Sequence, residues 1–190
     1  IAPMDSEERN MQAALAVRHS LRNSYTVKRG HVGKVYAAAA TALALAEAEY
    51  DLVAVVGYAA ASDAFSTGEV VCPRRARYHD VRVPEGLDGV DFLTNPYDTA
   101  GTDDAQIFTG DAFVGPDEIR EIKSRYGCSR ALFDMESTAV CQICANRGKP
   151  VIIIKMVSDT PEKGCTADSF ERFVAEHTDF GVFVDILEKE

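Results

Sequence analysis

The run Val151-Ile-Ile-Ile-Lys-Met-Val157 constrains the fold of this chain more than any other segment. Apolar and polar residues do not alternate along it, which is typical of a strand that helices cover on both faces. Ser158 and Asp159 follow directly. In an open α/β sheet, ligands bind outside the carboxyl ends of such strands. We therefore expect Asp159 to lie at a binding site.

Strands and helices are predicted to alternate along the rest of the chain. The patterns indicate strands at 25–28, 52–56, 69–72, 106–109 and 131–133, and helices at 5–22, 34–49, 116–126, 136–147 and 168–187. Residues 58–62 are predicted to form a loop, and residues 83–104 an irregular surface excursion. The alternation predicts a three-layer α/β/α sandwich with a mixed, largely parallel central sheet. The length of 190 residues favours a single domain over residues 1–190.

Composition narrows the classes of partner. A net charge of −10 disfavours binding to a nucleic-acid backbone, so we expect no nucleic-acid partner. We also expect no membrane span, because no apolar stretch is long enough to cross a bilayer. Five cysteines, an odd number, make a disulfide framework improbable and favour the reducing cytoplasm. A small molecule is the partner that these properties favour.

Several short motifs do not support the chemistry that they suggest. Cys141 and Cys144 have C-x-x-C spacing, but they fall inside a predicted helix, where buried structural cysteines are far commoner than zinc or redox sites. The turn from Gly30 to Lys34 lacks the glycine spacing and the hydroxyl residue of a phosphate-binding loop. The histidines lack metal-ligand spacing, and no G-x-S-x-G elbow is present. We therefore expect neither a metal nor a cofactor.

Three carboxylates fall at predicted junctions between strands and helices. Glu136 opens a helix, Asp159 ends a strand, and Glu7 lies near the start of the first helix, where Asp5 and Glu8 are predicted to form a capping box. Each acid alone has an ordinary explanation in helix capping or a turn, because acidic residues at helix starts are stabilised by the macrodipole. Their number favours a shared site.

Seven segments resemble one known family in sequence and in order. They are Ala2-Pro-Met-Asp-Ser-Glu7, Gly30-His-Val-Gly-Lys-Val35, Gly68-Glu-Val-Val71 with Ala76-Arg-Tyr-His-Asp80, Thr109-Gly-Asp-Ala-Phe-Val114, Asp134-Met-Glu-Ser-Thr-Ala139, Val157-Ser-Asp159 and Ser169-Phe170. The chain thereby resembles the nucleoside phosphorylase superfamily, and in particular the 5′-methylthioadenosine/S-adenosylhomocysteine nucleosidases. The resemblance implies a phosphorylase/hydrolase-like fold.

The resemblance also implies a role for each matching residue. Asp159 corresponds to the general acid that protonates the purine as the N-glycosidic bond breaks, oriented by Ser158, and Glu7 to the carboxylate that activates water. Substrate-binding residues are implied as well: Glu136 for the ribose hydroxyls, Met135 under the sugar, Phe113 and Val114 at the base, and Tyr58 near the ribose. Phe170 matches an aromatic that closes the pocket of a neighbouring subunit, and a core position in the last helix is the equal alternative. The implied activity is hydrolysis of a purine nucleoside such as 5′-methylthioadenosine, S-adenosylhomocysteine or a related adenosine derivative.

Two departures from the family pattern concern the expected site. Tyr58-Ala-Ala-Ala61 replaces a Ser-Ala-Gly-Gly loop, so a phenol stands where a hydroxyl near the ribose is usual, and Lys155 replaces an arginine. A phosphate-dependent purine nucleoside phosphorylase is the first alternative, although an acidic first loop would repel phosphate. A non-catalytic nucleoside-binding or storage-type protein is the second. Family resemblance further implies a homo-oligomer, commonly a dimer.

Overall fold

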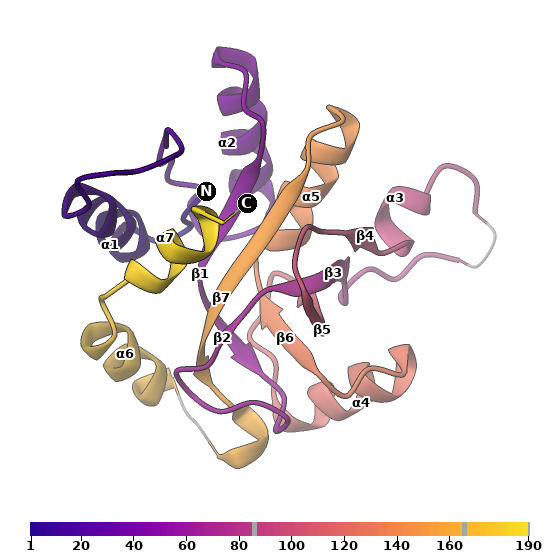
Figure 1. The fold of residues 1–190 in the computed structure, drawn as a ribbon. Coiled ribbons are helices and arrows are strands. Elements are labelled where there is room, and N and C mark those ends of the chain that lie inside the picture. The colour runs from indigo at the N-terminus through magenta and orange to yellow at the C-terminus, as the bar shows by residue number, and fades with distance from the viewer. Residues whose placement is uncertain (85–86, 165–166, 190) are drawn as a thin grey trace.

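Seven strands form one sheet in the order β2-β7-β1-β6-β5-β3-β4 in the computed structural model, which describes residues 1–84, 87–164 and 167–189 (Figure 1). The strands are β1 (Val53–Ala61), β2 (Val70–Val71), β3 (Pro73–Tyr78), β4 (Tyr97–Asp98), β5 (Asp103–Thr109), β6 (Ala131–Asp134) and β7 (Val151–Asp159). The helices are α1 (Asp5–Ala16), α2 (Lys34–Glu47), α3 (Asp91–Thr94), α4 (Pro116–Tyr126), α5 (Ser137–Asn146), α6 (Ala167–Glu176) and α7 (Gly181–Leu187), with a 3₁₀ turn at Pro161–Lys163.

The sheet is mixed, and its directions determine where the strand ends meet. β7 runs parallel to β1, and β5 runs parallel to both β6 and β3, but β6 runs antiparallel to β1, as do β2 to β7 and β4 to β3. The β1–β6 contact pairs Ala60 with Phe133, while Ala60 also lies beside Asp159 on β7. The chain leaving β6 therefore approaches the middle of β1 from the direction opposite to the end of β7.

Helices cover both faces of the sheet, as the sequence predicts. On one face α2 and α5 pack on residues such as Val55, Leu132 and Ile153. On the other face α1, α6 and α7 pack on Val56 and Ile154, and α4 packs on Phe108 and Phe133 (Figure 1). The continuous apolar run in β7 is buried because both of its faces meet helices. None of the helices in the described ranges combines the length and apolar character of a membrane span.

Two predicted elements near the N-terminus differ from the structure. The first helix ends at Ala16 rather than near Arg22, because the backbone N–H groups of Arg22 and Asn23 donate to the carboxylate of Glu188 instead of to helix carbonyls. Residues 25–28, predicted as a strand, are coil, and the next residue, Arg29, forms an isolated bridge with Ala2. The N–H of Ala2 donates to the carbonyl of Lys28, and Tyr25 and Val27 pack against the core beside α1 and α7.

Two further differences affect the region of the expected site. Residues 58–61 of the predicted loop at 58–62 are strand, because β7 continues to pair with β1 as far as Ala60. The predicted C-terminal helix is divided into α6 and α7, because Asp179 accepts a hydrogen bond from the N–H of Gly181 and forms a local turn. The side chain of Asp168, at the predicted start of that helix, lies outside the described residues.

Candidate active site

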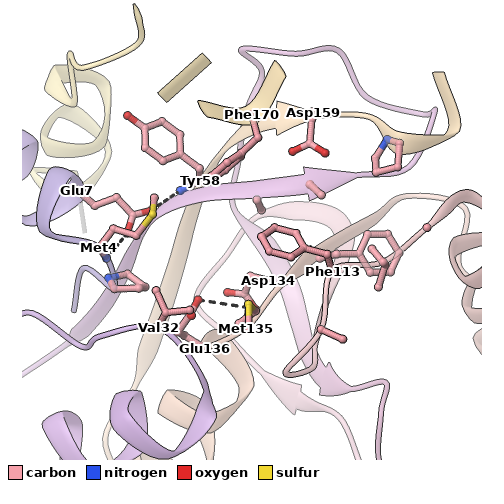
Figure 2. A pocket seen from close by; sticks show the side chains of 18 of the residues that line it. Met4, Glu7, Val32, Tyr58, Phe113, Asp134, Met135, Glu136, Asp159 and Phe170 are labelled. Carbon is pink, nitrogen blue, oxygen red and sulfur yellow. Dashed lines mark hydrogen bonds between the residues drawn. The ribbon is translucent and has the colours of Figure 1, made fainter. Parts of the chain in front are cut away.

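A cavity of about 420 Å³ opens over the middle of β1. It lies on the sheet face that α1, α6 and α4 cover, between α1 and α6 on one side and α4 on the other. Its walls come from the N-terminal segment, the turn before α2, β1, the segment after β5, the end of β6 and the end of β7. The lining residues are Pro3, Met4, Glu7, Val32, Tyr58, Ala59, Ala60, Ala112, Phe113, Val114, Gly115, Pro116, Phe133, Asp134, Met135, Glu136, Asp159, Pro161 and Phe170. Carboxylates thus enter an otherwise mostly apolar chamber (Figure 2).

Glu7 is fixed by two backbone donors at the start of α1. Met4 is the N-cap residue, and its N–H donates to Glu7 Oε2 at 2.7 Å, while the N–H of Tyr58 donates to Glu7 Oε1 at 2.8 Å. The predicted capping box of Asp5 and Glu8 is therefore wrong, and Asp5 pairs instead with Arg9 and Arg29. Because Glu7 occupies the third helical position, it is the acid whose side chain reaches back to the cap.

The environment of Glu7 is suited to a base. Burial raises its pKa, although the charge of Lys155 and the two backbone N–H donors act in the opposite direction. A carboxylate whose pKa is raised and whose two oxygens are both held can accept a proton from a water molecule in the cavity.

Replacing Gly57 with alanine should displace Glu7. An added Cβ would lie 2.1 Å from Glu7 Oε1, a contact that forces the carboxylate to move. We expect the Gly57→Ala variant to lose at least about tenfold in activity, because a misplacement near 1 Å at a reacting group is that costly. Gly148→Ala is the control: its φ is also positive, at +62°, but nothing lies within 4 Å of the added atom. The control should lose stability by about 1 kcal/mol without losing specific activity, and equal activity of both variants would contradict this placement.

Glu136 lies at the N-cap of α5 and faces the cavity. Its Oε1 accepts from the N–H of Gly33 at 2.9 Å, and its Oε2 accepts from the N–H of Met135 at 3.3 Å. Burial, assisted by the neighbouring charge of Asp134, raises the pKa of Glu136 to about 7. Its charge therefore changes in the physiological range.

A buried ion pair lies beneath these carboxylates. Lys155 is 0% exposed, and its Nζ lies 3.1 Å from Asp134 Oδ2. Asp134 also accepts from Thr109 Oγ1 at 2.7 Å and from the N–H of Ser137. Burial alone would lower the pKa of Lys155, but the carboxylates of Asp134, Glu7 and Glu136 outweigh it and raise that pKa. Lys155 thus holds a positive charge below the acidic site.

Asp159 reaches the cavity from the end of β7, on the side opposite Glu136 (Figure 2). It is half-buried, and burial raises its pKa, while a hydrogen bond from Ser158 Oγ at 2.6 Å acts against the rise. The Ser158 hydroxyl also lies 3.1 Å from the carbonyl of Ala59. Ser158 is not among the lining residues, but its hydroxyl contacts both Asp159 and the backbone of Ala59, so we expect it to orient the acid.

Aromatic and apolar residues form the remaining walls that the sequence predicts. Val114 is buried, Met135 flanks Glu136, and Phe113 is 83% exposed at the mouth of the cavity. The rings of Phe113 and Phe170 lie edge to face, with centroids 6.5 Å apart. Two aromatic rings that meet across an opening offer a flat ligand both stacking and edge contacts.

Tyr58 lines the cavity, but its phenol is bonded elsewhere. Its hydroxyl donates to the carbonyl of His177 at 2.5 Å and accepts from Asn10 Nδ2 at 3.3 Å. Because its proton is already donated to His177, this hydroxyl can contact a sugar only as an acceptor unless that bond breaks. What Tyr58 offers to the site in this arrangement is its backbone N–H, which holds Glu7.

Sequence reasoning missed several lining residues. Met4 and Val32 enter the cavity from a cap and from a turn, where neither hydrophobic period predicts a direction. The turn at Val32 is shaped by His31 and Gly33, whose φ angles of 57° and 98° are both positive. Asp134 falls in a segment that resembles the family but was given no role, although Lys155 signals it, since a lysine inside an apolar strand needs a buried counter-ion.

Comparisons with known proteins identify the family to which the chain belongs. A family model described as the phosphorylase superfamily matches residues 9–181. A 5′-methylthioadenosine/S-adenosylhomocysteine nucleosidase of Thermotoga maritima is 28% identical over 182 residues, which cover 88% of this chain and 81% of the relative. A protein of the same description from Buchnera aphidicola is 26% identical over 183 residues, covering 86% of this chain and 78% of the relative.

Solved structures match the fold over nearly the whole chain. An S-adenosylhomocysteine nucleosidase of Streptococcus pyogenes, in complex with 5-methylthiotubericidin, superposes with a TM-score of 0.75 at 22% identity, covering 100% of this chain and 94% of that chain. A 5′-methylthioadenosine/S-adenosylhomocysteine nucleosidase of Neisseria meningitidis, in complex with methylthio-immucillin-A, gives 0.75 at 21% identity, covering 100% and 97%. At these identities the likeness establishes the three-layer fold.

Proposed function

Because the chain belongs to the phosphorylase superfamily, we propose that it hydrolyses the N-glycosidic bond of a purine nucleoside and releases the free base. One observation carries the proposal: Glu7, Glu136 and Asp159 enter a single cavity from different elements, and the other described lining residues are mostly apolar. The names of the similar nucleosidases support the same reaction.

Asp159 is the proposed general acid. Breaking a ribosyl–purine bond leaves negative charge on the base, and a proton delivered to the purine turns it into a neutral leaving group. Burial raises the pKa of Asp159 and so favours the protonated form that this role needs. Phe113 and Val114 would hold the base from the neighbouring wall, with Phe170 closing the opening.

Carboxylates are the proposed stabilisers of the sugar. The transition state has positive, oxocarbenium-like charge on the ribose, which negative groups nearby stabilise. Glu136 would accept hydrogen bonds from the ribose hydroxyls, Met135 would pack under the ring, and Glu7 would take a proton from the attacking water. One proton passes from the attacking water to Glu7, the remaining hydroxyl bonds to the sugar carbon, and Asp159 gives one proton to the departing base.

Water is favoured over phosphate as the nucleophile by the charges at the cavity. No arginine, lysine or histidine is among the described residues that line it, whereas four carboxylate side chains are. A phosphate dianion entering this chamber would meet like charges without a cationic partner. Phosphorolysis is the first alternative, and a binding protein without catalysis is the second.

The proposed substrates are 5′-methylthioadenosine, S-adenosylhomocysteine or a related adenosine derivative, on the strength of the similar nucleosidases. A panel of purine nucleosides, incubated with the enzyme and analysed for free base, tests the reaction class and the substituent together. If the chain binds a nucleoside but releases no base, the second alternative, a binding protein without catalysis, is supported instead. If it neither binds a nucleoside nor releases base, the proposal is rejected.

The acid limb of the pH profile should belong to Glu136. Below its pKa of about 7 the carboxyl is neutral and accepts sugar hydroxyls poorly, so we expect kcat/KM to rise as the pH increases through about 7. Glu136→Gln cannot ionise, so it should be slower than the parent above a pH of about 7, approach the parent's rate below it, and lose that limb. If the limb persists unchanged in Glu136→Gln, another group, such as Glu7, controls it.

Self-association is proposed on family resemblance, and a sizing column tests it. Exposed apolar residues gather beside the mouth of the cavity: Val32 and Phe113 line it, and Val35 and Tyr36 follow on α2 with exposed fractions of 77% and 65%. A dimer that covers this surface would bury the apolar area that a lone chain exposes. A cytoplasmic location stays a prediction.

A further inference from the structure

Tyr58 connects three elements around the cavity. Its side chain is 5% exposed in the middle of β1, its hydroxyl accepts from Asn10 of α1, and it donates to the carbonyl of His177, the residue directly after α6. At 2.5 Å, the bond to His177 is the shorter of the two. It satisfies a carbonyl at the end of α6, where helix carbonyls lack intrahelical partners.

The ring of Tyr58 also holds α6. It packs edge to face with Phe173 of α6, at a centroid distance of 6.0 Å, and with Phe180 before α7, at 5.4 Å. The ring of His177 in turn stacks on Phe173 at 3.7 Å. The carboxyl-terminal half of α6 is therefore fixed to β1 by both the ring and the hydroxyl of one tyrosine.

Phe170 lies one helical turn before Phe173 on the same helix, and it lines the cavity opposite Phe113 (Figure 2). Residues three apart on a helix share a face, so an anchor at Phe173 also sets the position of Phe170. The cavity wall at Phe170 thus depends on where Tyr58 holds the helix.

We propose that Tyr58 is a positioning residue that fixes α6, and with it Phe170, over the substrate cavity. The inference rests on the proposed nucleoside hydrolysis. The backbone N–H of Tyr58 holds Glu7 whatever the side chain, so the phenol governs the substrate wall and not the water-activating carboxylate. Substrate affinity and turnover are therefore separable at this position.

Tyr58→Phe tests the proposal, because it removes the hydroxyl and keeps the ring. We expect KM for the nucleoside to rise by about three- to tenfold, the equivalent of one lost hydrogen bond, while kcat stays within about twofold. Amide hydrogen exchange in α6 should become faster, and exchange in α5 should not change.

Tyr78→Phe is the matched control. Tyr78 is buried on β3, and its hydroxyl donates to Gln142 Oε1 at 2.7 Å on the face covered by α5. Loss of this bond should cost similar stability but should leave KM and the exchange of α6 unchanged. If Tyr58→Phe and Tyr78→Phe behave alike, Tyr58 is only a core residue and the proposal fails.

A double-mutant cycle with Phe170→Ala shows whether Tyr58 acts through Phe170. The single variant Phe170→Ala should raise KM. Adding Tyr58→Phe to it should raise KM little further, because the wall that Tyr58 positions is already gone. Independent, multiplying effects would contradict the route through Phe170. Hydrogen exchange needs no substrate. If the protein releases no base, the proposed function is rejected, but hydrogen exchange still shows whether Tyr58 fixes α6.

Discussion

Asp159→Asn is expected to reduce the rate of base release from an adenosine derivative at least about 100-fold, the usual contribution of a positioned general acid. The amide cannot give a proton to the leaving purine, whereas its oxygen can still accept the hydrogen bond from Ser158. Because Asp159 is half-buried at a strand end and the substitution keeps the shape, circular dichroism and thermal unfolding should stay close to the parent.

A substrate that needs no acid separates chemistry from structural damage in this variant. A nitrophenyl riboside releases nitrophenolate, a stable anion, so its hydrolysis does not depend on proton transfer to the leaving group. Asp159→Asn should therefore cleave it at a rate within a few fold of the parent. Similar losses on both substrates would mean that Asp159 shapes the cavity and does not protonate the base.

Lys155→Met is expected to lower the free energy of unfolding by about 3–5 kcal/mol, the usual cost of removing one partner from a buried ion pair. Methionine nearly fills the volume of the lysine, but it leaves Asp134 without its cationic partner. The lysine side chain that is removed is fully buried, so water does not replace it. Urea denaturation of the purified variant measures the change.

Two further variants define the cause of that loss. Adding Asp134→Asn to Lys155→Met removes the uncompensated charge and should restore a large part of the stability. Lys149→Met breaks a surface pair with Glu49 and should change stability by less than about 0.5 kcal/mol. If the double variant is no more stable than Lys155→Met, charge compensation is not the reason that a lysine lies in β7.

The same substitution should move the pH profile. Removing the positive charge beneath Glu136 and Glu7 disfavours their ionised forms, so their pKa values should increase. The acid limb of kcat/KM should then shift to higher pH in whatever fraction of Lys155→Met remains folded. A shift to lower pH would contradict the electrostatic role of Lys155.

Local patterns predicted the layers of the fold but not the direction of its central strands. The non-alternating run that became β7 and the Pro116 and Gly127 boundaries of α4 are short-range signals, and all three match the structure. That β6 runs against β1 follows from long-range pairing, on which periodicity carries no information. The opposite approach of Glu136 and Asp159 to the cavity was for this reason not predictable.

The residues expected at the site were identified from motifs, but their partners were not. Glu7, Glu136 and Asp159 do line one cavity, whereas the backbone donors that hold Glu7 come from Met4 and from Tyr58, far apart in sequence. Tyr58 marked a departure from the family, and its hydroxyl contacts became visible only when α1 and α6 were placed beside β1. Such contacts depend on helix packing, which no local pattern encodes.

The most direct test of the central claim is base release from 5′-methylthioadenosine in buffer free of phosphate, followed by addition of phosphate. We expect free adenine and a reducing sugar at a rate that phosphate does not raise, because the cavity presents carboxylates and no cationic side chain among its described lining residues. A requirement for phosphate, with formation of a sugar 1-phosphate, would contradict hydrolysis.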